Sequence, residues 1–202
     1  MTPPQSPDDG VARVERAAGV LAPAVALGAI FLATLLSPTF TWTGDPLSFL
    51  GSDGQPTRPL FNYGLVAGGL LSLPFGHYLS TTGRDRLQRS GGVLFALTGL
   101  AMGLVGVFPM GTDPHFPVAV AFYLLLSLTL WVHGAGALRV GEARRWVGAA
   151  AIALGTLNVV TWAVYVAVFA ETGLSLAIPE TVGALALGVW TAGTALRVGP
   201  TG

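Results

Sequence analysis

The sequence predicts an all-α integral membrane protein, a bundle of six transmembrane helices. Three observations support this fold class. Only 10% of the 202 residues are charged, whereas a soluble domain carries about 25%. Six apolar segments are each long enough to cross a bilayer, which takes roughly 20 residues. The arginines are concentrated in alternate connections between those segments, as expected for a chain that crosses a membrane repeatedly.

The predicted spans hold no Asp, Glu or Arg in their interiors. They cover approximately residues 17–37, 60–80, 91–108, 115–138, 146–170 and 179–196. The first is about 20 residues long, which exceeds the 7–15-residue apolar core of a cleavable signal peptide. We therefore expect it to be an uncleaved helix. Residues 1–16 are predicted to be a polar, disordered tail, and residues 17–197 to form the membrane domain.

The arginines predict how the chain is oriented. Nine of the ten arginines lie in the tails and connections on one side of the predicted bundle: Arg13, Arg16, Arg84, Arg86, Arg89, Arg139, Arg144, Arg145 and Arg197. The other side has Arg58 with Asp45, Asp53, Asp113, Glu171 and Glu180. Because positive charge is retained in the cytoplasm, we expect a multi-pass protein of the cell (plasma) membrane with both termini cytoplasmic. The cytoplasmic arginines are expected to meet anionic lipid headgroups. A net charge of zero argues against a nucleic-acid partner.

Missing residue types exclude several chemistries. The chain has no cysteine and no lysine. Without cysteine, the chain cannot form disulfides, ligate iron–sulfur clusters or use thiol catalysis. Without lysine, it cannot form a Schiff base or a P-loop. No charged residue lies deep within a span, so an ion-coupled pump has no buried charge to titrate. Passive transport stays open as an alternative.

The first outer connection predicts a short interfacial helix. In the segment Thr43–Gly51, Asp45 can cap a helix, Pro46 suits its first position and Gly51 suits its end. The apolar residues between them favour a position in the membrane interface, over the mouth of the bundle.

The other two outer connections also predict helix starts. Asp113-Pro114 has the pattern of a cap followed by a first-turn proline, which places His115 on the first turn of the fourth span. Pro179-Glu180 begins the last span with a proline and an acid that favours the positive end of the helix dipole.

Several of these segments together resemble a known family. They are Leu47–Gly51, the pair Phe61-Asn62, Gly106–Pro109 and the following His115. The chain resembles, from about Gly19 to Leu196, the membrane family known only as domain of unknown function 998 (DUF998), small six-helix proteins of archaea and bacteria. The resemblance implies this fold and no activity. In the family an acid commonly follows the serine at Ser48, and Phe49 in its place weighs against metal or acid–base chemistry there.

The polar residues of the outer side are the candidate functional site. We expect binding of a lipid, a small ligand or a partner protein through the outer loops and the bundle mouth. The candidate ligand-binding residues are Asp45, Ser48, Asn62, His115, Asn158 and Glu180. The alternative is a membrane-embedded enzyme acting on lipid at the outer face, with His115, Ser48 and Asp113 as catalytic candidates. No spacing indicates a metal site, and no cofactor is predicted. Capping and loop-to-loop hydrogen bonds would also explain these residues.

Two histidines suggest a further alternative. His77 and His133 lie at similar depth near the cytoplasmic ends of the second and fourth spans. Bis-histidine ligation of haem b would make the protein an electron carrier. A relay of two haems needs four histidines, and the chain has three. Hydrogen bonding at the inner membrane edge is the structural alternative.

Other patterns predict how the helices pack. Small residues recur at four-residue spacing in Gly64/Gly68, Gly99/Gly103, Ala151/Gly155 and Ala184/Gly188. Such pairs permit close helix contact, within the bundle or in a homo-oligomer or with a membrane partner protein. Asn158, Thr161, Trp162 and Tyr165 share one helix face. Because an unpaired amide is costly in lipid, we expect Asn158 to face the bundle interior.

Overall fold

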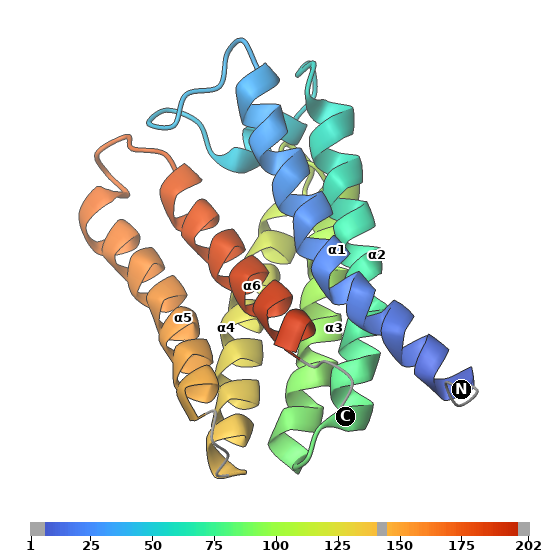
Figure 1. The fold of residues 1–202 in the computed structure, drawn as a ribbon. Helices are drawn as coiled ribbons and strands as arrows, with labels where there is room; N and C mark the ends of the chain where they lie inside the picture. Colours follow the sequence, from blue (N-terminus) through green and yellow to red (C-terminus); the bar gives the residue numbers. More distant parts are fainter. Residues whose placement is uncertain (1–6, 141–144, 198–202) are drawn as a thin grey trace.

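The computed structural model describes residues 7–140 and 145–197, and this part of the chain is all-α. Its six long helices are α1 (Pro7–Leu36), α2 (Arg58–Thr82), α3 (Arg86–Val107), α4 (His115–Arg139), α5 (Arg145–Val164) and α6 (Ala177–Arg197). Two short elements are the 3₁₀ helix η1 (Leu47–Gly51) and the π-helix η2 (Tyr165–Phe169), which continues α5. The helices run alternately up and down, so α1 begins and α6 ends at the same end of the bundle (Figure 1). The six predicted helices are confirmed.

Within the described ranges, four of the helices are long and apolar enough to cross a membrane. They are Asp9–Leu36, Arg86–Val107, His115–Arg139 and Arg145–Phe169, as expected for a multi-pass membrane protein. Helices α2 and α6 do not reach the same hydropathy. Both helices contain buried glycines and buried residues with hydroxyl side chains, which lower the hydropathy. Examples are Gly68 and Ser72 in α2 and Thr191 in α6.

Two boundaries differ from the sequence prediction. Helix α1 begins at Pro7, so the prediction of a disordered tail is wrong for residues 7–16; residues 1–6 of that tail lie outside the described residues. Glu15 helps to explain the longer helix, because its Oε1 accepts a hydrogen bond from Nδ1 of His77 in α2 at 2.6 Å. In α5 the α-helical pattern ends at Val164, and the amide of Ala170 bonds to the carbonyl of Tyr165 in the π pattern.

The helices pack mainly in sequence order, and α6 closes the bundle against α1 and α5. The predicted small residues lie at these contacts. Gly64 and Gly68 face Ala29 and Ala26 of α1, Gly99 faces Ser72, Gly155 faces Trp131, and Gly188 faces Leu27. Packing within the bundle is thereby confirmed for these positions. Oligomerisation stays a prediction.

Aromatic residues fill the core between α2, α3 and α6. The ring of Phe75 has no exposed surface and meets Phe95 edge-to-face, with centroids 5.6 Å apart at 87°. Phe95 in turn packs against Trp190 at 5.7 Å. Edge-to-face and tilted contacts of this kind are the favoured arrangement of aromatic rings.

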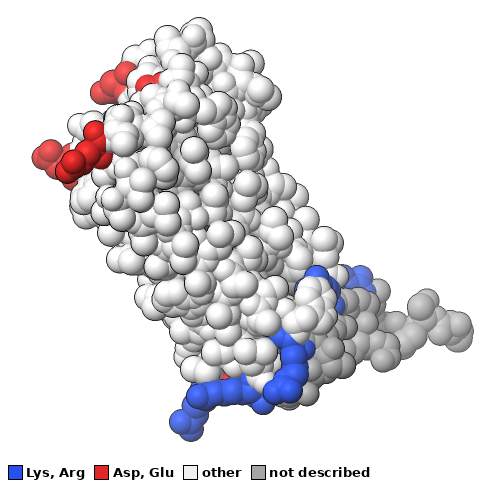
Figure 2. All heavy atoms as spheres, turned by 90° about the vertical axis from the view of Figure 1, so that its left-hand side faces the viewer, with Lys and Arg blue, Asp and Glu red and all other residues white. Residues whose placement is uncertain are grey.

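Charge is divided between the two ends of the bundle. In the face shown in Figure 2, arginines gather at one end and acidic residues at the other, with an uncharged belt between them. We call these the arginine end, where α1 and α3 begin, and the acidic end, where α2 and α4 begin. The separation has exceptions at both ends. Asp85 caps α3 at the arginine end, and Arg58 at the acidic end pairs with Asp53 at 2.5 Å.

Candidate functional site

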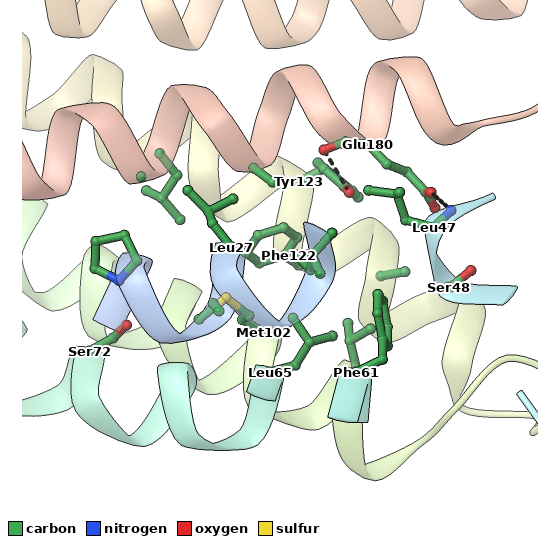
Figure 3. Close-up of a pocket in the computed structure, with 18 of the residues that line it drawn as sticks. Leu27, Leu47, Ser48, Phe61, Leu65, Ser72, Met102, Phe122, Tyr123 and Glu180 are labelled. Atoms are coloured by element: carbon green, nitrogen blue, oxygen red, sulfur yellow. Dashed lines mark hydrogen bonds between the residues drawn. The ribbon is translucent and has the colours of Figure 1, made fainter. Parts of the chain in front are cut away.

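A cavity of about 80 Å³ runs through the bundle toward the acidic end (Figure 3). Its walls come from α1, α2, α3, α4 and α6, and η1 contributes Leu47 and Ser48. Side chains of Leu27, Leu65, Met102 and Phe122 line the middle. The cavity is smaller than the roughly 300–1,000 Å³ typical of drug-sized sites, so it suits a narrow ligand.

The cavity is long for its volume. Ser72 lies at the end opposite Ser48 and Glu180 in Figure 3. Along α2, Phe61 and Ser72 both line the cavity and are separated by a helical length of roughly 16 Å at 1.5 Å per residue. The hydroxyl of Ser72 donates to the carbonyl of Gly68 at 2.8 Å, and that of Thr191 donates to Leu187 at 2.7 Å. Both hydroxyl groups therefore donate within their own helices. An apolar ligand group at this end of the cavity would leave neither donor without a hydrogen bond.

The 3₁₀ helix η1 forms a roof over the acidic end of the cavity. Three hydrogen bonds hold it to α2 and α6: the Leu47 amide to Glu180 Oε2 at 2.5 Å, Thr57 Oγ1 to the Leu50 carbonyl at 3.0 Å, and Asn62 Nδ2 to the Gly51 carbonyl at 2.9 Å. Leu50 is completely buried. The predicted short helix is therefore present, and its apolar side chains Leu47 and Leu50 pack on the bundle.

The two predicted acidic caps are wrong. The residue before η1 is Pro46, without a side-chain cap. Asp45 instead accepts hydrogen bonds from the amide and hydroxyl of Thr41, at 2.8 and 2.9 Å. Helix α4 begins at His115, as predicted, but Pro114 occupies the capping position and no side chain caps it. A capping carboxylate would accept from the amide two residues on. That amide is bonded elsewhere in both places: Leu47 donates to Glu180 at 2.5 Å, and His115 donates to the Thr112 carbonyl at 3.1 Å.

Four polar residues surround the acidic end of the cavity, which we call the mouth: Ser48, His115, Tyr123 and Glu180. Nδ1 of His115 donates to the Phe108 carbonyl at 2.8 Å, because a carbonyl can only accept. This leaves Nε2 of the neutral ring as an acceptor. The Tyr123 hydroxyl donates to the backbone carbonyl of Glu180 at 3.3 Å, as drawn in Figure 3.

The structure brings together three of the predicted site residues. Ser48, His115 and Glu180 line the mouth, whereas Asn62 holds η1 and Asp45 holds its own turn. Asp113 is exposed. In the part of the chain described here, the hydrogen bonds of Ser48 and His115 go to Met110 and Phe108. These two residues and Asp113 are therefore not joined as a catalytic triad. No group of three possible metal ligands among His, Cys, Asp and Glu occurs within residues 7–140 and 145–197.

Asn158 faces the bundle interior, as predicted. It is 1% exposed, and its Nδ2 donates to the Tyr123 carbonyl at 3.2 Å and to Ser127 Oγ at 2.9 Å. On the same helix face, Trp162 packs against Tyr123 with ring centroids 4.9 Å apart. Asn158 does not line the cavity, so its prediction as a ligand-binding residue is not supported there. Its hydrogen bonds join α5 to α4.

The two histidines of the haem alternative have different partners. His77, on α2, is exposed and bonds to Glu15. The ring of His133, on α4, packs edge-on against Trp190 of α6 at 5.1 Å. Helix α3 packs against both α2 and α4. The facing pair that bis-histidine ligation requires is therefore not formed.

Tyr123 is the mouth residue that sequence reasoning missed. It lies within a long apolar run, between Phe122 and Leu124, where an aromatic residue is usually part of the core. Its contact with Glu180 joins residues 57 positions apart. No local spacing signals such a contact.

Comparison with known proteins identifies the family without assigning an activity. The model of the family described as "Protein of unknown function (DUF998)" matches residues 20–197. No curated protein and no solved structure matches the chain. The match covers almost the whole bundle, from within α1 to the end of α6. The chain therefore belongs to the DUF998 family.

Proposed function

We propose that this protein spans the cell membrane six times and binds the apolar chain of a lipid-like ligand in its cavity, with the ligand's polar end at the mouth. The observation that carries the proposal is the narrow cavity, apolar along its length and polar at one end. Ligand sites that are mostly apolar with a few convergent polar groups are typical of small-molecule binding.

The proposed membrane position includes α2 and α6. These helices have 25 and 21 residues, which at 1.5 Å per residue exceeds the hydrocarbon thickness of about 30 Å. They run beside the four apolar helices from one end of the bundle to the other (Figure 1). With the arginine end in the cytoplasm, both chain ends are cytoplasmic and the mouth opens on the outer side.

A cysteine-labelling experiment tests the orientation without background, because the chain has no cysteine. Asp113→Cys lies at the acidic end and Arg86→Cys at the arginine end. We expect a membrane-impermeant maleimide to label Asp113→Cys in intact cells and Arg86→Cys only after lysis. Labelling in the opposite order would invert the topology.

A cavity-filling substitution tests ligand binding. Ala184 lines the cavity, and its neighbour Leu185 is 39% exposed. The probe is a photoactivatable monoacylglycerol, with the reactive diazirine at the end of a single acyl chain. We expect the purified protein to be labelled on residues of the cavity wall, and Ala184→Phe to reduce that labelling about tenfold because its ring occupies the space of the chain.

Leu185→Phe is the matched control, since it adds the same ring on the same helix at a partly exposed site. It should label as the wild type does. Labelling that is unchanged by Ala184→Phe, in a variant whose thermal unfolding matches that of the wild type, would show that the probe does not occupy the cavity.

A further inference from the structure

The four polar residues of the mouth, as the structure describes it, can accept hydrogen bonds, and none of them is an arginine. Glu180 is 8% exposed, and His115 offers Nε2 as an acceptor because Nδ1 is committed to the Phe108 carbonyl. Ser48 adds a hydroxyl, whose contact with the Met110 sulfur at 3.6 Å is a weak one. None of the lining residues is arginine, and Arg58 at this end is paired with Asp53.

Among the described residues that line the mouth, an anionic head group would find the Ser48 hydroxyl as a hydrogen-bond donor but no arginine to offset its charge. Carboxylates and phosphates are bound in proteins by arginine, lysine or groups of backbone amides. The backbone amide of Leu47, at the cavity wall, already donates to Glu180. A negative charge beside the Glu180 carboxylate would also be repelled, and such repulsion is strong where water is excluded.

From these observations we infer that the ligand is a single-chain lipid whose head group donates hydrogen bonds and carries no negative charge, as a long-chain alcohol or a long-chain amine does. This inference rests on the proposed function. The chain would extend past Leu65 and Met102 toward Ser72, whose hydroxyl is already bonded. The head group would donate to the acceptors at the mouth, with Glu180 as the residue that selects against acids.

Competition among three ligands of equal chain length tests the inference. Tetradecanol, tetradecylamine and tetradecanoate are each titrated against the photoactivatable monoacylglycerol, at a pH where the amine is protonated and the carboxyl groups of both tetradecanoate and Glu180 are ionised. We expect the alcohol or the amine to displace the probe at a concentration about tenfold or more below that of the acid. Competition by the alcohol, by the amine or by both shows whether the mouth binds a hydroxyl head group, an ammonium head group or either.

Glu180→Gln tests the selecting residue. The amide keeps an oxygen that can accept from Leu47 and removes the charge. We expect the discrimination against tetradecanoate to fall to within about threefold, because only the charge repulsion is removed. Glu171→Gln is the matched control: Glu171 is an exposed acid at the same end that does not line the cavity, and the discrimination should stay.

The outcomes separate the two proposals. Equal competition by all three ligands, or strongest competition by tetradecanoate, overturns the inference about the head group while leaving chain binding in place. A probe that does not label the cavity at all overturns the proposed function itself. The ranking of ligands in the wild-type protein decides the matter even where Glu180→Gln fails to fold.

Discussion

Replacing Gly69 with alanine is expected to destabilise the bundle strongly. Helices α2 and α3 touch at this point, and a Cβ atom on Gly69 would lie 2.6 Å from the carbonyl oxygen of Gly99 and 2.9 Å from Cα of Gly103. Both obstacles are backbone atoms, so the helices themselves must separate. Overpacking of this kind costs about 2–3 kcal/mol, more than the roughly 1 kcal/mol that alanine gains over glycine in a helix.

Gly103→Ala is the matched control on the facing helix. Its Cβ would meet Cα of Gly69 at 3.9 Å and the carbonyl oxygen of Val66 at 3.9 Å, which is ordinary van der Waals contact. We expect a stability equal to that of the wild type, or higher by up to about 1 kcal/mol from helix propensity. Unfolding of the purified protein by SDS titration in bicelles measures both. Equal stabilities for the two variants would contradict the close approach at Gly69.

Replacing Phe75 with alanine is expected to cost about 3–5 kcal/mol, the usual range for removing a buried aromatic ring. The ring has no exposed surface and packs against Phe95 and Tyr78, with centroids 5.6 and 6.1 Å away. These partners belong to helices held by many other contacts, so they cannot collapse fully into the space. The same SDS titration measures the loss.

Phe116→Ala provides the comparison on the surface. Phe116 is 76% exposed, so its removal should change the free energy of unfolding by less than about 0.5 kcal/mol. A loss at Phe75 no larger than that at Phe116 would mean that the aromatic core does not contribute as the structure indicates.

The helices were predictable because their signals are local. A low content of charge and long apolar runs place a chain in lipid whatever its partners are. Pro114 predicts that α4 begins at His115. Pro179 predicts that Glu180 lies in the first turn of α6. The prediction of a disordered tail was wrong at residues 7–16, where α1 continues. The hydrogen bond between Glu15 in this segment and His77 is a contact with another helix, which no local pattern reveals.

The site was predictable only in part. Ser48, His115 and Glu180 are conspicuous as polar residues beside apolar spans, and they line the mouth. Asp45 and Asn62 are equally conspicuous, yet they bond to Thr41 and Gly51 and serve the loop. Residue type alone does not distinguish a side chain that supports a roof from one that faces a cavity.

The amino-acid sequence by itself indicated a membrane protein, the six helices and the concentration of arginine at one end, because each depends on composition over a short stretch of chain. The tertiary structure alone decided the cavity, the place of Tyr123 and the unequal roles of Gly69 and Gly103. These depend on distances between residues far apart in the chain. Gly69 and Gly103 are the same residue type in similar apolar helices. Only the approach of α2 to α3 puts backbone atoms where a Cβ of Gly69 would lie and leaves ordinary van der Waals space at Gly103.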